Sequence, residues 1–337
     1  MTISATRTEY SIASSADFLE PIEAELKLVE EILSRELCSS VQTVSALTNH
    51  MLEAGGKRLR PSLVLLSARA CAKDYDVEKV VSLAAVTEMV HTATLIHDDV
   101  IDDADSRRGR PTANSKWGNQ ISVLSGDYVV ARAFSLMAQY SQTALIEVLA
   151  KATVSMAEGE ISQLEMKGDA SASTEHYLSV IQDKTAAFIS ACCQSGALLV
   201  GGEAVRESLA QYGLNLGTAF QITDDLLDLV GNPKVTGKPI GGDVREGKVT
   251  LPLILAMQRA TPSDREAIER IVSSAGATSE DLDFVRRVTI DTGAIELTRN
   301  AASEFVSQAV NCLSALPPGE AVNCLKHLAY HVLDRQK

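Results

Sequence analysis

Two apolar, helix-like stretches of this chain each end in a cluster of aspartates. Residues 98–103 read DDVIDD after the apolar lead-in ATLIH, and residues 224–228 read DDLLD after AFQIT. Residues i and i+4 share one face of a helix, so each buried helix projects carboxylates one turn apart. One such cluster could equally be a helix cap or a solvated face. Two matching clusters favour a site with a bound cation, because unpaired carboxylates in a half-buried wall are costly. Oxygen-only ligands on short side chains suit Mg²⁺ that bridges to phosphate.

Apolar residues elsewhere also recur at helical spacing, and strand signals are nearly absent. We therefore predict an all-α fold, a single large bundle of about ten or more helices. Residues 16–337 are expected to form this one domain, after a disordered segment at 1–15. A turn is expected at 107–112. The main predicted helices cover residues 77–104, 119–140, 143–167, 174–200, 203–230, 249–260, 263–274, 279–292, 294–315 and 319–335.

Bulk composition excludes several classes of protein. The formal charge of −13 argues against a nucleic-acid partner, because phosphate backbones select basic surfaces. The six cysteines show no metal-binding spacing, which favours a reducing compartment. Neither a signal-peptide core nor an uninterrupted apolar stretch of about 18 residues is present. We expect a cytoplasmic protein that contacts a membrane surface at most transiently, when it releases its product.

Basic residues stand beside the acidic clusters. Residues 55–61 read GGKRLRP at a predicted helix start, where backbone N–H groups favour an anion. Arg107 and Arg108 follow the first cluster, and guanidinium groups bind phosphate oxygens in pairs. Carboxylates repel a diphosphate by about 4 kcal/mol per charge pair at 4 Å, so the acidic clusters need bridging metal. The cationic 55–61 segment can bind a diphosphate without bridging metal, which predicts two diphosphate sites of different character.

Residues 231–247, with five glycines and two prolines, resemble a binding loop.

From about residue 50 to 250 the chain resembles the trans-isoprenyl (polyprenyl) diphosphate synthases. The resemblance rests on an ordered set of motifs: GGKRLRP (55–61), HTATLIHDDVIDDADSRRGRPT (91–112), WGNQISVLSGDY (117–128), KT (184–185), FQITDDLLD (220–228) and GKPIGGDVREGKVTLP (237–252). A lone DDxxD would be weak, since terpene cyclases share it. Cyclases lack the GGKRLRP segment and usually carry a different second metal motif.

The resemblance implies a central active-site cavity within the helical bundle, and a prenyltransferase that joins isopentenyl diphosphate to an allylic diphosphate primer. About three Mg²⁺ ions per active site would assist ionisation of the allylic diphosphate. It implies metal ligands at Asp98, Asp102 and Asp224, with Asp228 in support. Cations on the allylic diphosphate would be Arg107, Lys184 and Lys238, and Lys248 would close the site. Isopentenyl diphosphate would sit on Lys57, Arg60, His91 and Arg108. Thr185 and Gln221 would place oxygens near the new allylic cation, and released diphosphate would take the proton. His97 has no such role and is expected to be structural.

Product length is predicted from the helix that precedes Asp98. Small or modest side chains stand where short-chain relatives typically carry aromatic plugs: Ala93, Thr94, Val90 and Thr87. A long product of the octaprenyl or solanesyl type is therefore favoured over a short farnesyl or geranylgeranyl product. A bulky residue on another helix could instead limit the product length. Two other functions remain open: a terpene cyclase or head-to-head condensing enzyme, and a silent regulatory subunit of a heteromeric enzyme. The family resemblance also implies a homodimer.

Overall fold

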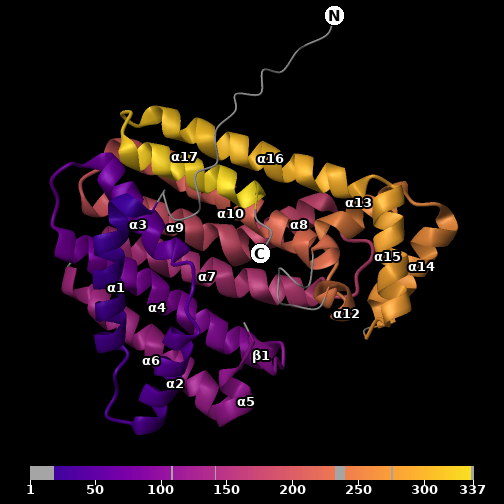
Figure 1. Cartoon of the computed structure of the whole chain (residues 1–337), viewed down its shortest axis with the longest axis horizontal. Coiled ribbons are helices and arrows are strands. Elements are labelled where there is room, and N and C mark those ends of the chain that lie inside the picture. Colours follow the sequence, from indigo (N-terminus) through magenta and orange to yellow (C-terminus); the bar gives the residue numbers. More distant parts are fainter. Residues whose placement is uncertain (1–18, 108, 141, 232–239, 275, 335–337) are drawn as a thin grey trace, which may run out of the picture.

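The computed structural model describes residues 19–107, 109–140, 142–231, 240–274 and 276–334. The expected segment 1–15 lies outside them. Helices make up nearly all of the described structure (Figure 1). The first half holds η1 (Glu20–Ile22), α1 (Glu23–Glu36), α2 (Gln42–Glu53), α3 (Leu59–Cys71), α4 (Val77–Ile101), α5 (Ala113–Trp117), α6 (Asn119–Met137), η2 (Ala138–Tyr140) and α7 (Thr143–Glu165).

The second half continues with α8 (Thr174–Ile181), the π-helix η3 (Gln182–Ala186), α9 (Ala187–Leu199), η4 (Glu203–Val205), α10 (Arg206–Val230), α12 (Gly242–Arg245), α13 (Leu251–Arg259), α14 (Pro262–Ser274), α15 (Ser279–Asp291), α16 (Ala294–Cys312), η5 (Leu313–Ala315) and α17 (Glu320–Leu333). The predicted all-α class is confirmed. One predicted helix, 174–200, is interrupted by η3. The expected turn at 107–112 carries a small antiparallel pair, β1 (Ser106–Arg107) with β2 (Arg110–Pro111).

Helix α4 is the central core helix. The Asp76 side chain caps its start by accepting a hydrogen bond from the backbone N–H of Lys79. Every residue from 80 to 90 is buried, as expected for a helix that is apolar on all sides. Among the described residues, α4 alone is long and apolar enough to cross a membrane, and 78% of that apolar window is buried inside the protein. Its hydrophobicity therefore serves the core, where it packs against α1, α3 and α6.

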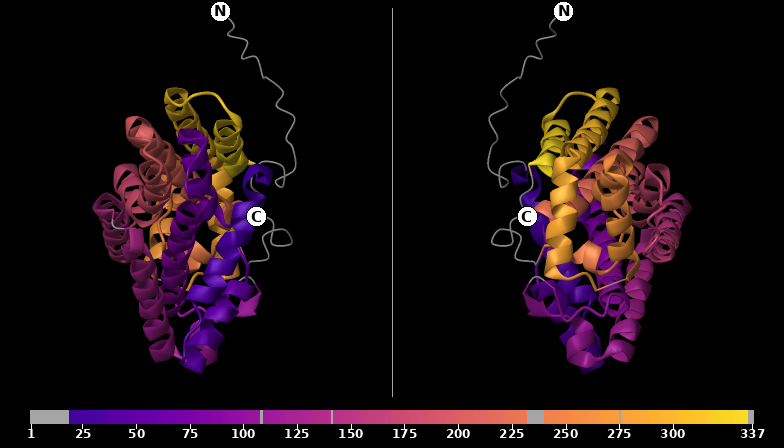
Figure 2. Two further views of the ribbon diagram at one scale, coloured as in Figure 1. Left: turned by 90° about the vertical axis from the view of Figure 1, so that its left-hand side faces the viewer. Right: turned by 90° about the vertical axis from the view of Figure 1, so that its right-hand side faces the viewer.

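Helix α10 carries the second acidic cluster and packs against α9 and α16. In Figures 1 and 2, α16 and α17 lie along one edge of the molecule, while α14 and α15 form one end. Two hydrophobic clusters fill the interior: one is centred on α3, α4 and α9, and the other on α8, α13 and the end of α10. Phe305 and Leu333 pack against both.

Candidate active site

The first acidic cluster lies in the last turn of α4. Asp98 is half-buried, and Asp102 caps the helix end one turn later. Burial raises the pKa of the Asp98 carboxyl to about 6, and the nearby Glu160 carboxylate adds to this rise. Lys184 and Arg107 act in the opposite direction. The structure therefore places Asp98 within the electrostatic reach of two of the cations that the sequence assigned to the allylic diphosphate.

The second acidic cluster lies in the last turns of α10. Asp224 is exposed, whereas the Asp228 carboxylate accepts hydrogen bonds from the backbone N–H groups of Gly242 at 3.2 Å and Asp243 at 3.0 Å. Asp228 thus anchors the start of α12 within the glycine-rich segment. Its supporting role toward metal stays a prediction. Lys238, in the same segment, lies outside the described residues.

Lys248 lies between the surroundings of the two clusters. Its Nζ lies 2.7 Å from Glu246 Oε2 and 4.0 Å from Asp102 Oδ1 of the first cluster. Burial alone would lower the pKa of Lys248, but the carboxylates of Asp243 and Asp102 outweigh it and raise the pKa. Since the backbone of Asp243 is held by Asp228, this lysine lies between the ends of α4 and α10. Lys248 therefore connects the end of α4 with the segment that Asp228 anchors at the end of α10.

The π-helix η3 presents Lys184 and Thr185 to this space. Lys184 Nζ lies 2.5 Å from Glu160 Oε2 and donates a hydrogen bond to Gln163 Oε1 at 2.7 Å. Both partners belong to α7. The Thr185 hydroxyl donates to Gln221 Oε1 at 3.0 Å, which joins η3 to α10. Such π-bulges often occur at functional sites, because the extra residue redirects side chains.

The 55–61 segment divides its cations between two tasks. Arg58 has a left-handed backbone (φ 48°), and its guanidinium turns inward to form ion pairs with Glu30 of α1 and, at 2.8 Å, with Glu88 of α4. Lys57 is exposed, and Arg60 is half-buried. Burial lowers the pKa of Arg60, while Glu88 and Asp98 oppose that effect. The Arg60 guanidinium therefore lies within the electrostatic reach of α4 carboxylates, while Arg58 holds the segment in place. The role of Arg60 toward isopentenyl diphosphate stays a prediction.

Arg107 and His91 complete the first wall. Arg107 Nε donates to Asp99 Oδ1 at 2.7 Å, which fixes the arginine beside the α4 end. His91 is half-buried two turns before Asp98, hence on the same face of α4. Arg108, assigned to the isopentenyl site, lies outside the described residues. His97 Nε2 lies 3.2 Å from the Val123 carbonyl oxygen, and its ring fills the space beside Gly126 of α6. This contact agrees with its predicted structural role.

Comparison with known proteins now identifies the family. The sequence model for polyprenyl synthetases matches residues 41–288. The chain belongs to the polyprenyl synthetase family. It is 37% identical over 319 residues to the all-trans-nonaprenyl-diphosphate synthase (geranyl-diphosphate specific) of Rhodobacter capsulatus, with 95% of this chain and 97% of the relative covered. It is 39% identical over 305 residues to the octaprenyl diphosphate synthase of Escherichia coli (strain K12), with 89% and 94% covered.

A solved relative shares the fold over nearly the whole chain. It is the polyprenyl synthase from Caulobacter crescentus CB15, crystallised with calcium and isoprenyl diphosphate, at a TM-score of 0.91 and 39% identity. The alignment covers 95% of this chain and 97% of that one. The predicted family and the predicted enzyme class, a prenyltransferase of the polyprenyl diphosphate synthase type, are confirmed.

The donor set of this chain suits hard divalent ions. Within the described ranges, no three Asp, Glu, His or Cys side chains already converge as a ready-made metal cluster. The carboxylates of Asp98, Asp102 and Asp224 instead come from the ends of two helices. Oxygen ligands spread in this way fit metals that complete their coordination with water and phosphate oxygens.

The predicted product-length residues divide between two faces of α4. Thr87 and Thr94 follow the face of Asp98 and His91, by helical spacing. Ala93 precedes His97 by one turn and so faces α6, as does Val90. Thr87 and Ala93 are fully buried, Val90 is 3% exposed, and Thr94 is half-buried. None of the four is bulky, which agrees with the basis of the sequence prediction; their role in setting product length stays a prediction.

Several neighbours of the site were not singled out from sequence. Glu160 and Gln163 are separated from Lys184 by about 20 residues, and only the packing of α7 on η3 brings them to it. Asp243 stands in a segment that the family motif covers, so its acidic character was a usable signal. Tyr177 gave no signal, because a buried tyrosine is usually a core residue.

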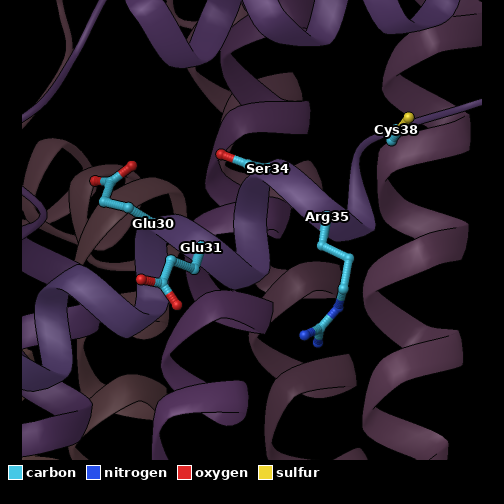
Figure 3. A pocket seen from close by; sticks show the side chains of 5 residues that line it. All are labelled: Glu30, Glu31, Ser34, Arg35 and Cys38. Atoms are coloured by element: carbon cyan, nitrogen blue, oxygen red, sulfur yellow. The ribbon is translucent and has the colours of Figure 1, made fainter.

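Away from the site, a shallow surface hollow over α1 is lined by Glu30, Glu31, Ser34, Arg35 and Cys38 (Figure 3).

Proposed function

We propose that this chain condenses isopentenyl diphosphate with an allylic diphosphate and repeats the step to build a long all-trans polyprenyl diphosphate. The observation that carries the proposal is the position of Lys248 between Asp102 of one acidic wall and Asp243 beside the other. A diphosphate between these walls would meet carboxylates that require bridging metal. It would also meet Lys184 and Arg107, which lie near Asp98.

Magnesium is the proposed cofactor, with about three ions held by Asp98, Asp102 and Asp224. When bound, it would supply Lewis-acid stabilisation of charge that develops on the leaving diphosphate. The protein's own cations add to this effect. Lys184 and Arg107 are already held by Glu160 and Asp99, so little reorganisation is needed as the C–O bond breaks.

Isopentenyl diphosphate is proposed to bind Lys57, Arg60, His91 and Arg108. The inward ion pairs of Arg58 fix the backbone from which Lys57 and Arg60 extend. The oxygens of Thr185 and Gln221, joined by a 3.0 Å hydrogen bond, supply partial negative charge for the allylic cation. No protein base is required, because the released diphosphate can accept the proton that the new carbon–carbon bond displaces.

A long product is supported by the small residues on α4 and by the relatives at 37–39% identity, which are named nonaprenyl diphosphate synthase, octaprenyl diphosphate synthase and heptaprenyl diphosphate synthase component 2. The geranylgeranyl pyrophosphate synthetase from Pyrococcus horikoshii Ot3 has the same fold, with a TM-score of 0.87, but only 29% identity. A short-chain product is therefore the second candidate. Fold alone does not separate the two.

A homodimer is also proposed, with cytoplasmic location and transient membrane contact during product release. Helix α6 exposes Ile121 (38%) and Leu124 (65%), and α7 exposes Val154 (56%) and Ile161 (58%). Apolar side chains exposed to this extent along two helices are typical of a surface that another subunit covers. We expect Leu124→Glu to shift the sedimentation coefficient toward that of a monomer, whereas the exposed Leu28→Glu on α1 would not.

The decisive experiment incubates the purified chain alone with labelled isopentenyl diphosphate, farnesyl diphosphate and Mg²⁺, followed by mass analysis of the products. Long polyprenyl diphosphates support the proposal. One relative at 35% identity is named heptaprenyl diphosphate synthase component 2, from Bacillus subtilis (strain 168), so activity of the single chain is informative. A chain that forms no product alone would instead support a subunit of a heteromeric enzyme. Asp98→Asn should abolish turnover, and Asp283→Asn on exposed α15 serves as the matched control.

A further inference from the structure

The second aspartate of each acidic cluster, Asp99 or Asp225, points away from its neighbours. Consecutive residues of a helix are about 100° apart, so Asp99 and Asp225 cannot share the face of Asp98 and Asp224. Asp99 is 1% exposed and Asp225 is 7% exposed, whereas Asp224 and Asp102 are exposed. Each cluster therefore has outer carboxylates directed at the site and one inner carboxylate directed into the fold.

The inner carboxylate of the first cluster holds an arginine. Asp99 Oδ1 accepts a hydrogen bond from Arg107 Nε at 2.7 Å, and the Arg107 side chain is only 29% exposed. A free arginine side chain samples many rotamers, and this ion pair restricts them before any ligand arrives. Because Asp99 directly follows Asp98 on α4, the pair holds the guanidinium beside the first acidic wall, where an allylic diphosphate would bind.

The inner carboxylate of the second cluster orients an amide. Asp225 Oδ1 accepts from Gln221 Nε2 at 2.7 Å, and Asp225 Oδ2 accepts from the buried Tyr177 hydroxyl at 2.6 Å. Since the Gln221 nitrogen is engaged by Asp225, its oxygen is turned toward Thr185, whose hydroxyl donates to it at 3.0 Å. The chain of contacts runs from Tyr177 on α8, through α10, to η3.

We propose that Asp99 and Asp225 are positioning residues rather than metal ligands: Asp99 aims Arg107 at the allylic diphosphate, and Asp225 fixes the direction of the Gln221 amide. This proposal rests on the proposed function. It assigns the two aspartates of each adjacent pair to different tasks, one toward the metal and one toward a substrate-facing side chain.

The first test compares Asp98→Asn with Asp99→Asn, which make the same chemical change at neighbouring positions. Asp99→Asn is expected to raise the KM for farnesyl diphosphate at least tenfold, while the KM for isopentenyl diphosphate and the Mg²⁺ concentration for half-maximal activity stay within twofold. Calorimetric titration of Mg²⁺ with inorganic pyrophosphate should give wild-type metal affinity for Asp99→Asn and at least tenfold weaker affinity for Asp98→Asn. Equal loss of metal affinity in both variants would overturn the proposal.

A double variant then tests whether Asp99 acts through Arg107. If it does, Asp99→Asn adds less than twofold to the farnesyl diphosphate KM in an Arg107→Lys background, because both changes remove the same contact. Additive effects would show that Asp99 acts elsewhere. If Asp99→Asn folds poorly, Arg107→Lys alone still tests the contact through the KM for farnesyl diphosphate, because it leaves the buried Asp99 carboxylate in place.

The second cluster allows a rescue experiment. Asp225→Asn replaces one of the two acceptor oxygens with a donor nitrogen, so residue 225 can no longer accept from both Tyr177 and Gln221. The Gln221 amide loses its fixed direction, and kcat is expected to fall at least tenfold. In the double variant Asp225→Asn/Gln221→Glu, the new amide at position 225 donates to the new carboxylate at position 221. That carboxylate still accepts from Thr185, and total charge is unchanged. Recovery of most of the lost kcat, with unchanged metal affinity, supports the proposal. If the double variant melts like wild type but recovers no activity, the proposal for Asp225 is wrong.

Tyr177→Phe provides a milder variant of the same contact. It removes one donor to Asp225 and leaves Gln221 as the other. A threefold or larger decrease in kcat at unchanged Mg²⁺ affinity is expected. A lower melting temperature with unchanged kcat would assign Tyr177 and Asp225 a purely structural role. Should the wild-type chain show no prenyltransferase activity, the proposed function fails. The calorimetric titration still reports whether Asp99 and Asp225 bind metal.

Discussion

Gly159 on α7 is the position where a single methyl group should displace Lys184. A Cβ at residue 159 would lie 2.3 Å from the Lys184 backbone nitrogen and 2.8 Å from its Cα, distances that real Cβ atoms essentially never show. Normal contact between non-bonded atoms needs about 3.5 Å. In Gly159→Ala, α7 and η3 must therefore separate by about 1 Å. The ion pair of Lys184 with Glu160 and its hydrogen bond to Gln163 both cross this contact.

The expected loss is mainly catalytic. Overpacking costs about 1–3 kcal/mol of folding free energy, and alanine regains about 1 kcal/mol over glycine within a helix. The net destabilisation of about 0–2 kcal/mol corresponds to a decrease in Tm of no more than about 8 °C. A 1 Å displacement of a positioning cation can lower kcat about a hundredfold. We therefore expect kcat with farnesyl diphosphate to fall about a hundredfold in a chain that remains folded at 25 °C.

Gly196→Ala is the matched control. Its new Cβ would lie 2.4 Å from the Val64 carbonyl oxygen, so it overpacks the α3–α9 contact to a similar degree. Residue 196 lies 11 residues from Thr185, about 16 Å along the helix. This variant should lose similar stability by thermal melting and keep kcat within threefold. If Gly159→Ala also kept kcat within threefold, the α7–η3 contact would not control the placement of Lys184.

Three further outcomes are expected. Arg58→Ala leaves the Glu88 carboxylate, which is 5% exposed, without its ion-pair partner, and should lower the free energy of unfolding in urea by about 3–5 kcal/mol; Arg58→Ala/Glu88→Gln should recover part of this, and no recovery would assign the loss to other contacts. Ala93→Phe should shorten the product in mass analysis, because the ring fills space beside α4; an unchanged product distribution would refute the assignment of this face to the growing chain. Cys38 is exposed, whereas burial raises the pKa of the Cys71 thiol to about 11, so only about one Cys71 thiol in a thousand is ionised at pH 8. Thiol titration of the native chain at pH 8 should show one fast-reacting thiol that Cys38→Ser removes, with the rate of the Cys71 reaction rising about tenfold per pH unit toward pH 11.

The local features of this chain could be predicted from its sequence. Helix positions follow from the spacing of apolar residues, and the shared face of Asp98 and Asp102 follows from helical geometry alone. The chemical character of the site also followed, because carboxylates beside guanidinium and ammonium groups suit metal-bridged diphosphates. The interruption at residues 182–186 was not predicted, because a π-bulge keeps the apolar spacing of an ordinary helix on both sides.

Partnerships between distant residues were decided by the tertiary structure. Sequence patterns placed Arg58 with the other cations of its turn, yet Glu30 and Glu88, 28 and 30 residues away, turn it into the fold. Asp225 belongs to a pattern typical of metal ligands, yet Tyr177, 48 residues earlier, and Gln221 engage both of its oxygens. Helical spacing fixes the direction in which a side chain leaves its own helix. The element that meets it there depends on how the helices pack, and this packing separates the inner aspartates from the outer ones.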